Sequence, residues 1–155
     1  MRVKWAGNGN GECVGQLRTS PPPPVAQELH VWVLHTSAEL RALRAGLHEA
    51  LTGHPLLAGQ SLDDIPERMV LVATELTTNA IKYGRPPTLI RLLRGDGEFI
   101  LDVADHDLEN IPELVDTRPV NAGGRGLALA LALSLDVGWY ATTTTKHVWA
   151  SFRAR

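Results

Sequence analysis

The sequence predicts an α+β fold, a two-layer α/β sandwich in which a mixed, mostly antiparallel sheet carries helices on one face. Three observations support this prediction. Runs of strand character occur in three separate regions, apolar residues at helical spacing define two amphipathic segments, and glycine-rich turns join neighbouring strands. The expected order is strand, helix, helix, hairpin, loop, helix and hairpin, which suits one domain in a chain of 155 residues.

The composition excludes several classes of function. A formal net charge of −2 gives no indication of a general nucleic-acid surface, so we expect no direct nucleic-acid partner. No apolar run reaches membrane-spanning length, and the N-terminus lacks the hydrophobic core of a signal peptide. We therefore expect a cytoplasmic protein with no membrane partner. The single cysteine, Cys13, excludes an internal disulfide and a zinc site built from several cysteines.

The chain divides after a proline run. Residues 1–24 are rich in glycine and end in Pro21-Pro22-Pro23-Pro24. Such a segment buries too little apolar surface to offset the entropy of ordering it, so we expect a disordered tail at 1–24. The prolines form either a spacer or, as the alternative, a docking motif. The folded domain is expected at 25–155.

The first strand and helix follow the tail. Residues 29–35 have strand character, and Thr36 or Ser37 caps a helix that ends at about Thr52, just before Gly53. Four leucines at helical spacing form its apolar stripe: Leu40, Leu43, Leu47 and Leu51.

A longer helix is expected over residues 64–83, with Pro66 in its first turn. Its apolar side comprises Ile65, Met69, Val72, Leu76 and Ala80. The remaining elements are a hairpin, a polar loop, an apolar helix and a final hairpin. Their predicted ranges are 88–94 and 98–104, 105–122, 127–135, and 137–142 with 147–153.

The long helix carries the first candidate site. Glu75 and Asn79 lie four residues apart and Lys82 three further on, so the three side chains share one face at the edge of the apolar stripe. A carboxylate there can activate a nucleophile, and an amide oxygen can hold Mg²⁺. The alternative is a solvated polar stripe on an amphipathic helix.

A glycine cluster opens the apolar helix. Gly123, Gly124 and Gly126 allow close backbone approach, and a helix N-terminus presents free N–H groups to a phosphate. A simple turn is the alternative. Arg125 pairs with a phosphate or a partner carboxylate, or else is solvated.

Two further sets of polar residues lie at the start of the long loop. Asp105 ends a strand, where its carboxylate can accept a hydrogen bond from an adenine amino group or simply stabilise a turn. His106, Asp107 and Glu109 are either polar loop residues or part of a metal cluster that would need a further ligand.

Together these segments resemble the ATPase domain shared by gyrase, heat-shock protein 90, histidine kinases and MutL proteins. Within that superfamily, whose architecture is the Bergerat fold, residues 28–153 look most like the bacterial anti-sigma-factor serine/threonine kinases. The motifs that carry the resemblance are Glu75-Leu76-Thr77-Thr78-Asn79-Ala80-Ile81-Lys82-Tyr83-Gly84, Gly123-Gly124-Arg125-Gly126-Leu127-Ala128-Leu129, and the ending Val137-Gly138-Trp139 with Val148-Trp149-Ala150.

The resemblance implies roles for these residues. Glu75 would be the general base, Asn79 would ligate Mg²⁺, and Asp105 would bind the adenine of ATP. Residues 106–122 would form a lid over the nucleotide. The remaining candidate cofactor-binding residues are Lys82, Gly123, Gly124, Arg125, Gly126 and Leu127. A sigma factor and an anti-sigma-factor antagonist would be the protein partners, and the resemblance also suggests a homodimer.

The sequence departs from the family pattern at the adenine end. The first glycine box normally has the form Asp-X-Gly, whereas this chain has Asp105-His106-Asp107. The last strand usually carries a threonine that supports the adenine-binding aspartate, and here His147 precedes Val148. Thr144 or Thr145 is the substitute if the turn shifts.

These departures keep a second function open, a catalytically silent module that binds ATP weakly or not at all and acts through protein contacts alone. A third, the catalytic half of a split histidine kinase, would require a helical phosphoacceptor domain for which this chain has no room.

Overall fold

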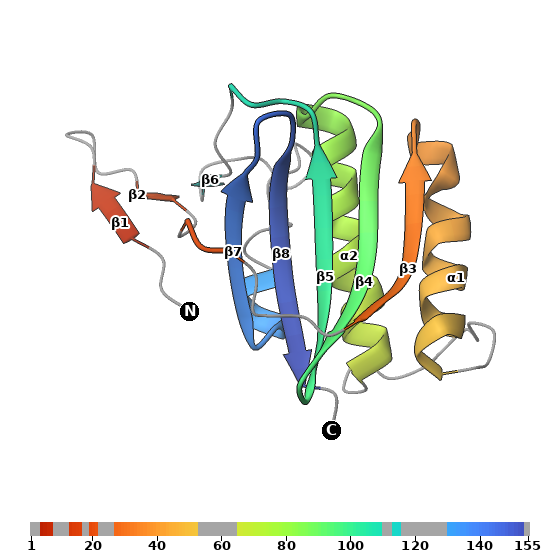
Figure 1. The fold of residues 1–155 in the computed structure, drawn as a ribbon. Coiled ribbons are helices and arrows are strands. Elements are labelled where there is room, and N and C mark those ends of the chain that lie inside the picture. The colour runs from red at the N-terminus through yellow and green to blue at the C-terminus, as the bar shows by residue number, and fades with distance from the viewer. Residues whose placement is uncertain are drawn as a thin grey trace.

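The computed structural model describes residues 4–7, 13–16, 19–21, 27–52, 65–109, 113–115 and 130–153. Five strands form a sheet in the order β3-β4-β5-β8-β7, and helices α1 and α2 cover one of its faces (Figure 1). The elements of this layer pair are β3 (Gln27–Leu34), α1 (Leu40–Thr52), α2 (Ile65–Tyr83), β4 (Thr88–Gly95), β5 (Glu98–Asp105), β7 (Asp136–Ala141) and β8 (Lys146–Arg153). The predicted two-layer α+β sandwich is confirmed.

The four pairings between the described strands of this sheet are all antiparallel, in line with the mixed, mostly antiparallel sheet that we expected. The hairpin between β4 and β5 turns at Gly97, whose φ of 71° is a conformation that glycine adopts without strain. Of the expected helix at 127–135, residues 130–133 are helical and the first three residues lie outside the described part of the chain.

A second, three-stranded sheet has the order β1-β2-β6 and comprises β1 (Lys4–Gly7), β2 (Cys13–Gln16) and β6 (Glu113–Val115). Strand β6 lies inside the segment 105–122, in which we predicted a loop without a strand. Strands β1 and β2 lie in the segment 1–24, where we expected a disordered tail. A domain boundary at residue 24 stays a prediction.

Helix α1 follows a single 3₁₀ turn, η1 (Ser37–Glu39). The Glu39 carboxylate turns back and accepts the backbone N–H groups of His35 at 3.0 Å and Thr36 at 3.3 Å. These bonds satisfy donors that have no partner inside the helix, so the start of the helix is fixed where Thr36 was expected to cap it.

The hydrophobic core lies between the sheet and the two helices. Leu43 and Leu47 of α1 are buried, as are Met69, Val72 and Leu76 of α2, so both predicted helical stripes face the sheet. The sheet contributes Leu34, Ile90, Leu92, Leu101, Val103, Val137, Ala150 and Phe152. Among the helices of the described ranges, none is long and apolar enough to cross a membrane.

A buried polar pair joins the two helices. His48 Nε2 of α1 lies 2.8 Å from Glu67 Oε1 of α2, and the two residues are only 1% and 8% exposed. Burying a polar group is costly unless it is hydrogen-bonded, so this pair favours the packing of α2 against α1 that keeps the two side chains together.

Replacing His48 with Ala should lower the free energy of unfolding by about 3 kcal/mol or more, because it leaves the Glu67 carboxyl group buried without this partner. Urea unfolding followed by circular dichroism measures the change. The matched control is Glu49→Ala at the next, exposed position, which should cost less than about 0.5 kcal/mol. Equal losses in the two variants would contradict a stabilising role for the pair.

Candidate nucleotide site

Helix α2 positions the predicted catalytic and metal-binding side chains. Val72 and Leu76 are buried on its core side, while Glu75 and Asn79 are partly buried and Lys82 is exposed. Glu75 and Asn79 therefore lie at the edge of the core, as their spacing predicts. A carboxylate and an amide one turn apart at such an edge can act on one bound group, because the helix holds their spacing fixed.

Asp105 lies at the last position of β5 and is 5% exposed. Its Oδ1 atom accepts the backbone N–H of Asp107 at 2.8 Å, and its Oδ2 atom lies 3.7 Å from Nζ of Lys146. Burial raises the pKa of the Asp105 carboxyl group, an effect that the Asp107 N–H and the Lys146 charge partly offset. Both carboxylate oxygens thus have a partner inside the protein.

Gly84 brings the end of α2 against Asp105. Its N–H donates to the carbonyl of Ala80 at 2.9 Å, which closes the last turn of the helix. A Cβ atom on Gly84 would lie 2.5 Å from both Cγ and Oδ2 of Asp105, a separation that real side chains do not tolerate. Only glycine allows this approach, so the C-terminal end of the helix that carries Glu75 and Asn79 packs directly against Asp105.

The segment that follows Asp105 is held by local hydrogen bonds. His106 donates its backbone N–H to Arg85 O at 3.1 Å, and its Nδ1 atom lies 3.1 Å from Pro87 O. The Asp107 carboxylate accepts the N–H of Glu109 at 3.0 Å, and Asp107 is only 4% exposed. In the ranges that the structure covers, no group of three His, Cys, Asp or Glu residues is arranged to hold a metal ion.

Strand β8 corrects one sequence-based assignment. We expected His147 to stand where the family has the threonine that supports Asp105, but the register pairs Asp105 with Lys146 and Ala104 with His147. Residues directly opposite in an antiparallel pair share a face, whereas successive residues alternate. Lys146 therefore occupies that place, and His147 points to the other side of the sheet.

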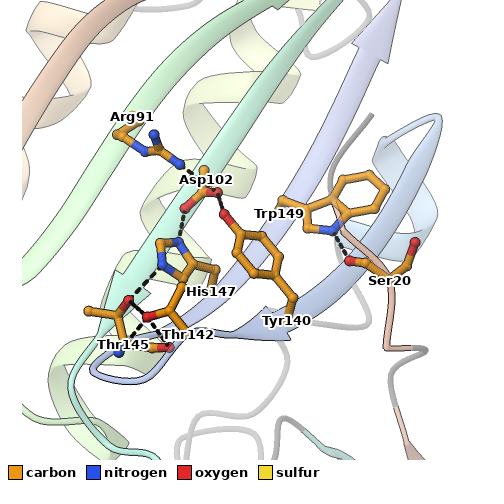
Figure 2. Close-up of polar contacts among 8 residues, drawn as sticks. All are labelled: Ser20, Arg91, Asp102, Tyr140, Thr142, Thr145, His147 and Trp149. Carbon is orange, nitrogen blue, oxygen red and sulfur yellow. Dashed lines mark hydrogen bonds and ion pairs between the residues drawn. The ribbon is translucent and has the colours of Figure 1, made fainter. Parts of the chain in front are cut away.

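The face of the sheet opposite the helices carries a polar network that the sequence analysis missed (Figure 2). Asp102, which is fully buried, is its centre: Oδ1 accepts from His147 Nδ1 at 2.6 Å, and Oδ2 accepts from the Tyr140 hydroxyl at 2.9 Å and from Arg91 at 3.2 Å. The three partners come from β8, β7 and β4, so the network crosses four strands. Strict alternation in β5 places Asp102 on the same face as Ile100, which was the available sequence indication.

His147 extends the network to the β7–β8 turn. Its Nε2 atom lies 2.8 Å from Thr145 Oγ1, and Thr145 Oγ1 lies 2.7 Å from Thr142 Oγ1. The imidazole also stacks on the Tyr140 ring, with a centroid separation of 4.5 Å. Hydrogen bonds therefore connect the threonine-rich turn to the strand pair. We had considered Thr145 as a residue that supports Asp105, but it contacts His147 instead.

Residues before the domain also contact this outer face. The Trp149 indole N–H donates to Ser20 O at 2.8 Å (Figure 2), and the Ser20 N–H donates to Trp139 O at 2.8 Å. Trp149 is buried together with Leu93 and Ile100. Ser20 thus lies against β7 and β8, within the segment where we expected a disordered tail.

The glycine cluster, Gly123, Gly124, Arg125, Gly126 and Leu127, lies outside the described residues, so its phosphate-binding role stays a prediction.

The model of the histidine kinase-like ATPase domain matches residues 33–152, from within β3 to within β8. The chain belongs to this family. Among solved structures, a similar one is the crystal structure of the RsbU and RsbW domains of Rv1364c from Mycobacterium tuberculosis, with 22% sequence identity and a TM-score of 0.53. The match covers 80% of this chain and 32% of that one, and at this identity it shows the fold alone. A search of curated proteins finds no match.

In this histidine kinase-like ATPase domain, the candidate residues on α2 have the chemistry that suits Mg²⁺, whereas the candidate for binding the adenine base already has partners within the protein. Glu75 and Asn79 are oxygen-bearing side chains at a core edge, which suits a hard cation and a nucleophile. Asp105 is the base-binding candidate, yet Lys146 and the Asp107 N–H already contact it.

The phenol of Tyr140 should make stability fall at alkaline pH. Burial, together with the adjacent Asp102 carboxylate, raises the Tyr140 pKa well above its ordinary value of 10.0. Above about pH 10 the unfolded chain releases this proton while the folded protein keeps it, so unfolding becomes more favourable as pH rises.

We expect Tyr140→Phe to show a shallower loss of unfolding free energy between pH 9 and pH 11 than the wild type. Urea titrations at each pH measure the two slopes. Parallel slopes would contradict the burial of an ionisable phenol beside Asp102.

Proposed function

We propose that this chain binds ATP with Mg²⁺ and acts as a serine/threonine protein kinase of the anti-sigma-factor type. It would sequester a sigma factor and phosphorylate a serine of the anti-sigma-factor antagonist, acting in the cytoplasm as a homodimer. The observation that carries the proposal is the close approach of Gly84, at the end of the helix that carries Glu75 and Asn79, to the carboxylate of Asp105. Family membership and the motif resemblance support it.

In this proposal each residue performs one task. Glu75 accepts the proton of the attacking serine hydroxyl, and Asn79 holds Mg²⁺. Asp105 accepts a hydrogen bond from the adenine amino group. The backbone at 123–127, with Lys82, contacts the phosphates, and residues 106–122 cover the nucleotide. When bound, Mg²⁺ neutralises phosphate charge, and the protein contributes mainly the positioning that phosphoryl transfer requires.

A second candidate function is a silent binding module with the same fold. The engaged oxygens of Asp105, and Asp107 where the family has glycine, favour this alternative. Such a protein would bind its partner without a requirement for ATP. Binding of nucleotide is therefore the property that separates the two functions.

Mg-ATP should raise the melting temperature of the full-length protein progressively with concentration, because a ligand that binds only the folded state stabilises it by mass action. Differential scanning fluorimetry over micromolar to millimolar Mg-ATP measures the shift, with Mg²⁺ and sodium triphosphate as separate controls. No shift at millimolar Mg-ATP would overturn the kinase proposal and favour the silent module.

Replacing Glu75 with Gln should abolish phosphotransfer while leaving nucleotide affinity within about twofold, because the amide keeps the shape of the side chain but is no base. Transfer from γ-labelled ATP to the antagonist proteins of the source organism measures the first property, and calorimetry measures the second. Asn79→Ala is the contrasting variant and should weaken Mg-ATP binding. Loss of nucleotide binding in Glu75→Gln would contradict the base assignment.

A further inference from the structure

Lys146 is a buried cation at the base end of the site. The residue is 8% exposed, and its Nζ atom lies 3.7 Å from Asp105 Oδ2. Removing an ammonium group from water is costly unless an anion compensates it, so the Asp105 carboxylate helps to stabilise Lys146 in this place.

The same carboxylate oxygen is the one left for a ligand. Oδ1 is engaged by the Asp107 N–H at 2.8 Å, within the turn that leaves β5. Oδ2 packs against Gly84 on one side and lies near Lys146 on another, and Asp105 as a whole is 5% exposed. An amino group from a purine must therefore compete with Lys146 for Oδ2.

The outer network holds Lys146 in this competing position. His147, the next residue, donates to Asp102 at 2.6 Å on the opposite face of the sheet, and Thr145, the residue before, contacts His147. Since neighbouring residues of a strand alternate in direction, anchoring His147 outward keeps Lys146 on the side of Asp105.

We infer that Lys146 sets the strength and base selectivity of nucleotide binding, because its ammonium group forms an ion pair with the Asp105 oxygen that would otherwise accept a hydrogen bond from the 6-amino group of adenine. This inference rests on the proposed nucleotide function. ATP then binds weakly, since its amino group must displace Lys146. A purine with oxygen at position 6 loses less binding affinity, because its oxygen can accept a hydrogen bond from the same ammonium group.

The test compares Mg-ATP with Mg-inosine triphosphate, which carries oxygen in place of the 6-amino group. Calorimetry on the full-length wild type, Lys146→Thr, Lys146→Met and Lys146→Arg gives the affinities. Threonine keeps a hydrogen-bond donor beside Asp105, methionine removes the charge at similar length, and arginine retains the cation. Melting curves identify which variants are folded, and Lys146→Thr decides the outcome if methionine prevents folding.

We expect Lys146→Thr to bind ATP about tenfold more tightly than the wild type and to raise the ratio of ATP to inosine triphosphate affinity by a similar factor. Lys146→Arg should keep the wild-type ratio. A general structural role for Lys146 would weaken both nucleotides alike and leave the ratio unchanged.

Two outcomes would overturn the inference. If the wild type binds ATP and Lys146→Thr binds it no better, Lys146 is no competitor, although the proposed nucleotide function stands. If folded wild type and folded variants all fail to bind either triphosphate, the proposed function fails as well.

Discussion

The register between β5 and β8 determines where the polar groups around Asp105 lie. It places Asp105 opposite Lys146 on one face, while His147 reaches Asp102 on the other. A slip of one residue would exchange these faces, so that Lys146 would face the outer network and the fully buried Asp102 carboxylate would lose its hydrogen bond from His147. The hydrogen bonds to Asp102 therefore do more than stabilise the sheet, because they also keep Lys146 opposite Asp105 on the other face.

The fold was predictable where the sequence is periodic. Leu43 and Leu47 in α1, with Met69 and Val72 in α2, repeat at helical spacing and are buried as expected. The small sheet was not predictable, because β6 is three residues long and its partner β2 is about a hundred residues earlier in the chain. Short strands without alternation gain their stability from pairing, which composition does not reveal.

The placement of the candidate side chains was predictable where it depends on one helix. The spacing of Glu75 and Asn79 defines their common face without reference to any other element. The base end depends on two strands whose register is set by distant side chains. Sequence position alone identified His147 as the residue beside Asp105, whereas pairing gives Lys146. The Asp102 network was missed for the same reason, since Asp102 and its partner His147 are 45 residues apart in the chain.

Gly84 gives the site a property that its individual contacts do not show. Because Gly84, directly after α2, lies too close to the Asp105 carboxylate to leave room for a Cβ atom, a displacement of this end of the helix would change the surroundings of Asp105. Thermodynamic linkage makes such coupling reciprocal. If a cation at Asn79 changes the affinity for the base by some factor, the base changes the affinity for the cation by the same factor. Under the proposed function, the metal and the base would then bind cooperatively, because Gly84 packs the helix end directly against Asp105.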